Sequence, residues 1–427
     1  MASSFKWALA TALAASLVCG PALAEAPSNE ELQKQIEALK DQIRVLTEKL
    51  SGQPAAAQPG LDKKVETQQQ QIQAQQEQIE ALAQQAEESK TADWVARTKI
   101  GGYGELHYNN LDGEGGATDL DRIDLHRFVL LFGHDFTDRV RFRSELEIEH
   151  AFIKDNVGGT ASAGEVEIEQ AYVEFDVNNE LTARGGLFLI PVGILNETHE
   201  PPTFYGVERN PVENAIIPST WWAGGAGLTW RFGEGWALDA AIHEGLKTSA
   251  ASNFAVRSGR QKTANADAQD LAGTLRVKWT GMPGLELAAT YQHQQDITQS
   301  SDPTAGSADL LEAHAVYQSG PFGLRALYAT WDLDGSGPAL VGADEQEGYY
   351  IEPSWRFSEQ WGAFLRYNQW DNRAGSGGPG TTEKTQYDIG VNYWPVQNVV
   401  IKADYQMQDN ENDQNRDGFN LGVGYQF

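Results

Sequence analysis

The last nine residues, 419–427, read FNLGVGYQF and decide the fold. Because successive side chains of a β-strand point to opposite faces, this stretch has one apolar and one polar face. The apolar face carries Phe419, Leu421, Val423, Tyr425 and Phe427. Residues 387–393 and 399–407 alternate in the same way. The end of the chain is therefore predicted to be a sheet with one apolar face.

Spacers of alternating length separate the predicted strands from residue 98 onward. Seven are short and carry the Gly, Pro, Asn or Asp of tight turns: 136–139, 177–180, 232–235, 281–284, 319–321, 357–360 and 395–398. Eight are longer and polar: 110–121, 153–164, 190–221, 247–267, 298–307, 334–345, 372–382 and 409–415. This pattern predicts an all-β, 16-stranded antiparallel transmembrane β-barrel over residues 98–427, with short periplasmic turns and long outer loops.

Two features favour a membrane barrel over a soluble β-sandwich, whose strands would also alternate. Tryptophans gather at the short-turn ends of strands, as an aromatic girdle requires: Trp230, Trp236, Trp279, Trp355, Trp361 and Trp394. The chain also ends a strand on Phe427, which resembles the carboxy-terminal signal of outer-membrane proteins. We therefore expect a barrel in the lipid of a Gram-negative outer membrane.

The first 24 residues have the pattern of a secretory signal peptide. Lys6 precedes the apolar stretch 7–18 (WALATALAASLV), and Ala22 and Ala24 form a small-x-small cleavage site. An uncleaved anchor is disfavoured, because a spanning helix needs about 20 apolar residues. Cleavage would also remove Cys19, the one cysteine, so we expect no disulfide in the exported chain.

Residues 25–93 are predicted to be a helical coiled-coil segment in the periplasm. Apolar residues follow a heptad in 25–51 and again in 61–90, with a Pro/Ala-rich linker between the two stretches. The first seam is Leu32, Ile36, Leu39, Ile43, Leu46 and Leu50. A solvated single helix and a disordered tail remain alternatives. The segment could contact peptidoglycan or a periplasmic partner.

The sequence predicts a channel and not an enzyme. It contains no nucleophile elbow, phosphate-binding loop or zinc-binding spacing, and we expect no cofactor. A net charge of −28 argues against nucleic acid as a partner. Two acidic outer loops have the oxygen density of a calcium site, although such clusters are usually only solvated. Their candidate ligands are Asp332, Asp334, Asp409 and Asp413.

Basic residues fall on the polar face of the predicted strands, where they would line the channel. The ladder is Arg141, Arg143, Arg184, Arg276, Lys278, Arg325, Arg356, Arg366 and Lys402. Rings of Arg and Lys make anion-selective pores, because they concentrate anions and lower the barrier to their entry. Acidic residues on the same face, such as Glu145 and Asp388, could pair with the ladder and leave a general diffusion pore.

The third long segment, 190–222, is unusually apolar for an outer loop. We expect it to fold back into the barrel and to form the constriction, although a packed external lid or a subunit contact would also explain its composition. The candidate constriction residues are Asn196, Glu197, His199, Glu200, Glu208 and Arg209.

The barrel sequence resembles the phosphate-selective porins O and P. The resemblance rests on GGLFLIPVG at 185–193, NETHE at 196–200, VER at 207–209, GGYGELH at 101–107 and the terminal Phe427, and it covers residues 98–427. It implies a homotrimer of separate channels that take up small anions. The third loop departs from the family pattern, because four glutamates accompany its one arginine.

These observations predict an outer-membrane porin that lets small hydrophilic solutes diffuse passively, with a preference for anions that could include phosphate. Two alternatives remain. The pore could be non-selective or cation-preferring if the glutamates of the third loop dominate the constriction. The chain could also be a structural tether of the outer membrane that acts through its coiled-coil segment.

Overall fold

The computed structural model describes residues 93–153, 164–380 and 382–427, together with residues 38, 41, 44, 45, 70, 73, 74 and 76–84. The chain divides into two units, Met1–Arg97 and Thr98–Phe427. The expected signal peptide lies outside the described residues. The few described positions of 25–93 are helical. The coiled coil stays a prediction.

Among the described residues, no helix has both the length and the apolar character that crossing a membrane would require.

The second unit consists of sixteen strands with a few short helices in the long loops. The strands are β1 (Thr98–Gly113), β2 (Leu120–Asp135), β3 (Val140–Glu149), β4 (Val166–Asp176), β5 (Leu181–Leu189), β6 (Trp222–Phe232), β7 (Trp236–His243), β8 (Ala272–Met282), β9 (Leu285–Gln294), β10 (Ala308–Ser319), β11 (Phe322–Leu333), β12 (Glu345–Trp355), β13 (Trp361–Asp371), β14 (Lys384–Val396), β15 (Val399–Gln408) and β16 (Arg416–Gln426). The helices are η1 (Pro201–Thr203), α4 (Val212–Ala215), η2 (Ala250–Ser252), η3 (Val256–Gly259) and α5 (Ser336–Val341).

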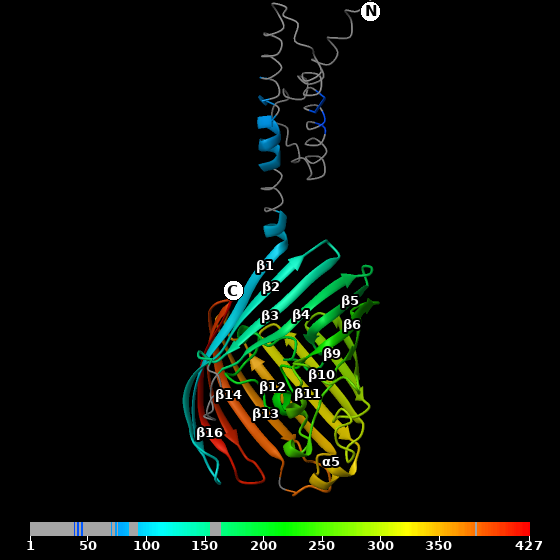
Figure 1. The fold of residues 1–427 in the computed structure, drawn as a ribbon. Coiled ribbons are helices and arrows are strands. Elements are labelled where there is room, and N and C mark those ends of the chain that lie inside the picture. Colours follow the sequence, from blue (N-terminus) through cyan, green and yellow to red (C-terminus); the bar gives the residue numbers. More distant parts are fainter. Residues whose placement is uncertain are drawn as a thin grey trace, which may run out of the picture. The chain divides into compact units, whose positions relative to one another are not determined.

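Each strand pairs antiparallel with its neighbours in sequence, and β1 pairs with β16 to close the barrel (Figure 1). The backbone N–H of Gly102 donates to the Phe427 carbonyl at 3.0 Å, and the Phe427 N–H donates to the Gly102 carbonyl at 2.8 Å. The last residue therefore takes part in closure. The predicted fold class, a closed 16-stranded antiparallel barrel, is confirmed.

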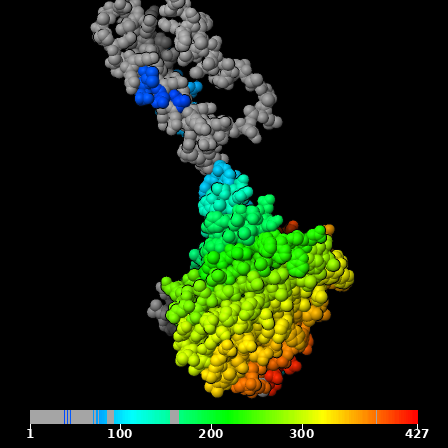
Figure 2. Space-filling view, turned by 90° about the vertical axis from the view of Figure 1, so that its right-hand side faces the viewer, coloured from blue at the N-terminus to red at the C-terminus, as the bar shows by residue number. Residues whose placement is uncertain are grey.

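The strands expose many large apolar side chains on the outer face of the wall. Figure 2 shows one side of the barrel, coloured along the sequence. Alternate residues of β14–β16 illustrate the pattern: Ile389 is 50 % exposed and Leu421 47 %, whereas Asp388 and Asn420 point inward and are buried. Five of the six predicted girdle tryptophans lie partly exposed on the outer face. Trp394 differs, because its inward ring packs edge-on against Tyr205 and its Nε1 donates to the Pro202 carbonyl at 3.3 Å.

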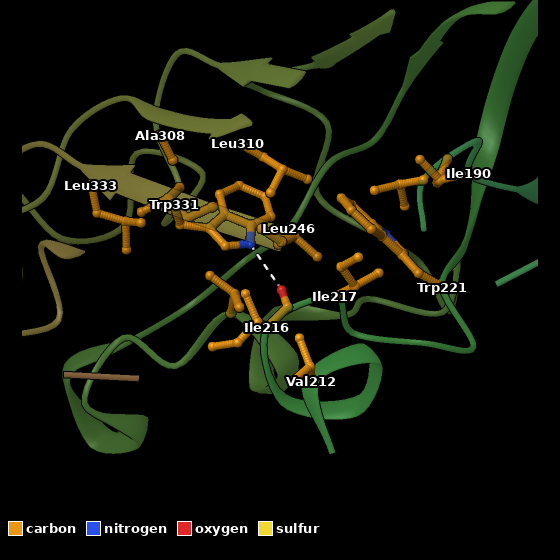
Figure 3. Packing of buried hydrophobic residues seen from close by; sticks show 14 of the residues in the cluster. Ile190, Val212, Ile216, Ile217, Trp221, Leu246, Ala308, Leu310, Trp331 and Leu333 are labelled. Carbon is orange, nitrogen blue, oxygen red and sulfur yellow. Dashed lines mark hydrogen bonds between the residues drawn. The ribbon is translucent and has the colours of Figure 1, made fainter. Parts of the chain in front are cut away.

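The hydrophobic core lies inside the barrel, between the wall and the loops that enter it (Figure 3). We call residues 190–221, between β5 and β6, L3, and residues 244–271, between β7 and β8, L4. Ile216 and Trp221 of L3 and Leu246 of L4 pack against Trp331 of β11. The Trp331 Nε1–H donates to the Ile216 carbonyl at 2.9 Å. Apolar packing therefore holds L3 against one part of the inner wall.

Candidate functional site

L3 crosses the barrel and is anchored by inward-facing polar side chains of several strands. Asp404 of β15 accepts the Val207 N–H at 2.6 Å, and Asn109 of β1 donates to Glu208 at 3.0 Å. Arg325 of β11 donates to the Thr203 carbonyl at 2.8 Å. These contacts place residues 199–209 across the lumen, so L3 narrows the channel.

The nine predicted ladder residues lie on the inward face of the strands or in the turn after β12, and five of them form ion pairs. Arg366 of β13 is fully buried among carboxylates: its Nε donates to Asp388 at 3.0 Å and its Nη1 to Glu352 at 3.2 Å. Other ion pairs join Arg141 to Glu174 and Asp176, Arg143 to Asp135, Arg276 to Asp239 and Glu197, and Lys278 to Glu286. Paired cations attract a passing anion less than free ones do.

The remaining four ladder cations contact rings or carbonyl groups. Arg325 donates to L3 as described above. Arg184 lies over the Phe188 ring, Lys402 over the Phe204 ring, and Arg356 over the Trp394 ring. These contacts attach the cations to the wall and to L3. Whether the ladder sets the selectivity stays a prediction.

The six predicted constriction residues separate into two groups. Glu208 and Arg209 line a cavity of about 650 Å³ inside the barrel. The other four do not line it. Asn196 is fully buried and braces the two ends of L3, because its side chain bonds the Ile190 carbonyl and both the N–H and carbonyl of Trp221. Glu197 pairs with Arg276, His199 is buried beside Glu145 and Glu169, and the side chain of Glu200 is half-buried.

Four of the seven acidic residues of the cavity form ion pairs with an arginine or a lysine. The seven come from L3, β1, β3, β4 and the residue before β4, and are Glu105, Glu147, Glu149, Glu165, Glu167, Glu169 and Glu208. Arg127 lies 2.8 Å from Glu105 and 3.1 Å from Glu147. Lys262 of L4 lies 2.8 Å from Glu165 and also pairs with Glu167. Arg127 and Lys262 therefore offset part of the negative charge of this surface.

The three arginines that L3 and L4 contribute to the same cavity have only neutral hydrogen-bond partners within the described part of the chain. Arg209 Nη1 donates to Thr220 Oγ1 at 2.7 Å, Arg260 Nη1 to the Thr220 carbonyl at 2.5 Å, and Arg257 Nη1 to the Ser219 carbonyl at 2.6 Å. We call these three residues the arginine cluster. Burial, followed by the charges of Arg260 and Arg209, lowers the pKa of Arg257 to about 9, so Arg257 remains charged at neutral pH.

Several N–H groups of the arginine cluster are buried without a hydrogen-bond partner among the described residues: Nε and Nη2 of Arg209, and Nε of Arg260. Buried donors of this kind normally have a partner, which can be water or an ion. The arrangement can therefore bind an oxyanion, because a guanidinium group matches the oxygens of phosphate or carboxylate.

Arg257, Arg260 and Lys262 are functional candidates that the sequence reasoning missed. They belong to L4, which was treated only as a long polar loop. The available signal was charge: residues 245–266 carry four basic residues and no acidic one, in a chain of net charge −28.

The predicted calcium ligands do not converge. Among the described residues, two groups bring three potential ligand atoms together, and neither includes Asp332, Asp334, Asp409 or Asp413. Asp334 instead accepts a hydrogen bond from Ser307 at 2.7 Å, and Asp409 and Asp413 are exposed.

Comparisons with known proteins agree with the barrel fold. An uncharacterized protein of Aquifex aeolicus (strain VF5) is 29 % identical over 367 residues, which cover 77 % of this chain and 79 % of that protein. The outer membrane channel DcaP of Acinetobacter baumannii superposes with a TM-score of 0.55 at 15 % identity, over 77 % of this chain and 97 % of DcaP. An anion-selective porin from Comamonas acidovorans superposes with a TM-score of 0.53 at 12 % identity, over 77 % and 99 % of the two chains.

A family model described as phosphate-selective porin O and P matches residues 99–427. The matched range includes all sixteen strands except the first residue of β1, as well as L3 and L4. The chain therefore belongs to the phosphate-selective porin O and P family and is an outer-membrane porin.

Proposed function

We propose that this porin is a passive channel for small hydrophilic solutes that prefers small anions, phosphate among them. The observation that carries the proposal is the charge balance of the lumen cavity. Four of its seven glutamates are paired with Arg127 or Lys262, whereas Arg209, Arg257 and Arg260 have only neutral hydrogen-bond partners among the described residues.

The arginine cluster lines the cavity through which a solute passes, so its charges act on the solute at close range. The screening length in physiological salt is about 8 Å, so charges farther than this contribute little. Low-dielectric walls strengthen the field of charges that line a channel. The net charge of −28 therefore does not decide the selectivity.

The comparisons also favour a preference for anions. The family carries phosphate selectivity in its description, and one similar solved structure is described as an anion-selective porin. A cation-preferring pore is the competing function, and the carboxylates of the cavity, including Glu208, favour it.

The proposal extends to assembly and topology. Residues 1–24 serve as a signal peptide, residues 25–93 form a coiled coil in the periplasm, and the barrel assembles as a homotrimer in outer-membrane lipid. The periplasmic segment would then be free to contact peptidoglycan or a periplasmic protein, which adds a tethering role to the channel.

The zero-current potential of the purified porin in a planar bilayer with a KCl gradient tests the selectivity. We expect a potential whose sign corresponds to Cl⁻ permeating faster than K⁺. Added phosphate should reduce the Cl⁻ current, because it competes for the arginine cluster. A potential of the opposite sign would refute the anion preference, and the absence of stepwise conductance would refute the channel function itself.

A further inference from the structure

A second polar cluster lies where L3 meets the wall, outside the lining of the lumen cavity except for Glu169. Glu145 of β3, Glu169 of β4 and His199 of L3 bring one ligand atom each to within 4.8 Å of one another. All three residues are buried, with 2 %, 1 % and 3 % of their surface exposed. Two carboxylates and an imidazole form a ligand set that suits divalent ions of the zinc class.

The distances fit a shared ion better than direct hydrogen bonds. His199 Nε2 lies 3.5 Å from Glu145 Oε1 and 3.7 Å from Glu169 Oε2. In a tetrahedral zinc site with bonds of about 2.0–2.2 Å, neighbouring ligand atoms lie about 3.3–3.6 Å apart. Neither His199 Nε2 nor Glu169 Oε2 has a hydrogen-bond partner among the described residues, although both atoms are buried.

The surroundings of His199 and Glu145 resemble the outer shell of a metal site. His199 Nδ1 lies 3.2 Å from the Asn196 carbonyl, which can only accept, so Nδ1 carries the proton. A ring that carries its one proton on Nδ1 presents the Nε2 lone pair to the carboxylates, as a metal ligand does. Glu145 is held by Tyr103, whose hydroxyl donates to Oε1 at 2.9 Å, and by Gln170, whose amide donates to Oε2 at 2.6 Å.

The charge of the cluster also calls for a cation. Glu147 of β3 is 1 % exposed and lines the neighbouring cavity together with Glu169. Among the described residues, the ion-pair partner of Glu147 is Arg127, and Arg127 is also paired with Glu105. Among the residues that the structure describes, no lysine or arginine is ion-paired with Glu145 or Glu169. Buried carboxylates without such a partner are costly, and a divalent ion would offset that cost.

We infer that Glu145, Glu169 and His199 bind a divalent transition-metal ion of the zinc class, which fastens L3 to β3 and β4. Water or Glu147 would complete the coordination. The ion would join the constriction loop to β3 and β4, in addition to the apolar packing that holds L3 against the inner wall. This inference does not depend on the selectivity of the channel.

The other group of potential ligands, His107, His126 and Glu208, provides a control. Both nitrogens of His107 already face carboxylates, with Nε2 3.2 Å from Glu105 and Nδ1 3.0 Å from Glu208. His126 belongs to this second group and lines the lumen cavity. His126→Gln therefore alters a histidine inside the barrel while Glu145, Glu169 and His199 stay in place.

Titration of the full-length porin with Co²⁺, after chelator treatment in detergent, tests the site. We expect one Co²⁺ per chain, a visible d–d absorption spectrum and displacement by Zn²⁺. Loss of an outer-shell partner alone weakens metal binding about 10–100-fold. His199→Gln and Glu169→Gln should weaken it at least tenfold, while His126→Gln should leave the affinity unchanged.

Thermal unfolding provides a readout of the tether. Zn²⁺ should raise the unfolding midpoint of the wild type and of His126→Gln, but not that of His199→Gln or Glu169→Gln, all of which should show the circular dichroism of a folded barrel. Wild-type porin that binds no Co²⁺, or binding that is lost in His126→Gln and retained in His199→Gln, would overturn the assignment. A bound ion that leaves the midpoint unchanged would overturn the tether.

Discussion

Arg366 donates to Asp388 at 3.0 Å across the β13–β14 pair, and neither side chain is more than 3 % exposed. A cation that the sequence placed in an anion-attracting ladder is therefore part of a buried ion network. Removing one member of such a network leaves the other charges uncompensated.

Arg366→Ala should destabilise the barrel by about 3–5 kcal/mol, because it leaves Glu352 and Asp388 buried without their partner. Arg143→Ala is the matched control. Its side chain is 29 % exposed and its pair with Asp135 is worth at most about 1 kcal/mol. Urea unfolding of the two variants measures the difference, and equal destabilisation would contradict the network.

Arg257→Ala with Arg260→Ala should lower the permeability ratio of Cl⁻ to K⁺ several-fold, because it removes two cations of the arginine cluster. The lysine double variant retains the charges and should keep most of the preference. The ladder hypothesis predicts that Arg141→Ala with Arg366→Ala lowers the same ratio. Zero-current potentials of the three variants show which set of arginines contributes more to the anion preference. An unchanged permeability ratio in the Arg257/Arg260 alanine variant would exclude the arginine cluster as its source.

Acid should weaken the contact between Glu208 and β1. Burial raises the pKa of Glu208, but the hydrogen bond and charge of His107 outweigh burial and lower it to about 2. The folded pKa lies below the unfolded value of about 4.3, so the contact contributes stability above pH about 4.3 and loses it as the pH falls toward 2.

The unfolding midpoint of the wild type should therefore exceed that of Glu208→Gln by a constant amount at neutral pH. The difference should shrink between pH about 4 and 2. A difference that persists at pH 2 would show that the charge of Glu208 is not responsible.

Trp331→Ala should destabilise the barrel by about 3–5 kcal/mol, because the ring is fully buried between L3, L4 and the wall. Trp331→Phe should have a smaller effect, which reports the lost hydrogen bond to the Ile216 carbonyl. Trp355→Ala is the control, since its ring is 50 % exposed on the outer face. Thermal unfolding in detergent compares the three, and single-channel conductance should rise only in Trp331→Ala.

Deletion of residues 25–93 should leave both the trimer and the selectivity unchanged, because the barrel contains the cavity and barrel-to-barrel contact should bury more surface than the short heptad stretches. Native mass spectrometry and the zero-current potential check the two outcomes. A dimer, both with and without the segment, would refute the trimer. A change in selectivity would mean that charges of the segment reach the pore.

The strand architecture could be predicted because it depends on local rules. Residues 399–407 alternate with period two, and the short turns carry residues suited to reversal, so strand number followed from the sequence. Trp394 shows the limit of this reasoning. Its position at a strand end predicted a girdle residue. Along the alternating strand β14, however, Trp394 lies on the same face as Asp388 and therefore points inward, beside Tyr205 of L3.

The lumen was harder to predict, because loops far apart in sequence meet there. L3 was recognised by its apolar composition, but Arg257 and Arg260 reach the cavity only because L4 also enters the barrel. The ion-pair partners of the charged residues could not be predicted either. The Arg276–Glu197 contact joins residues separated by 79 positions, and nothing in either local sequence indicates the partner.

The placement of the core inside the barrel constrains how this porin can evolve. Trp221, Trp331 and their neighbours support the fold and hold L3, which narrows the channel. A substitution that trims these side chains to admit larger nutrients would also remove the packing that keeps the protein folded. Selection for broader uptake should therefore act first on the polar arginines and glutamates, which can change the preferred solute at little expense in stability.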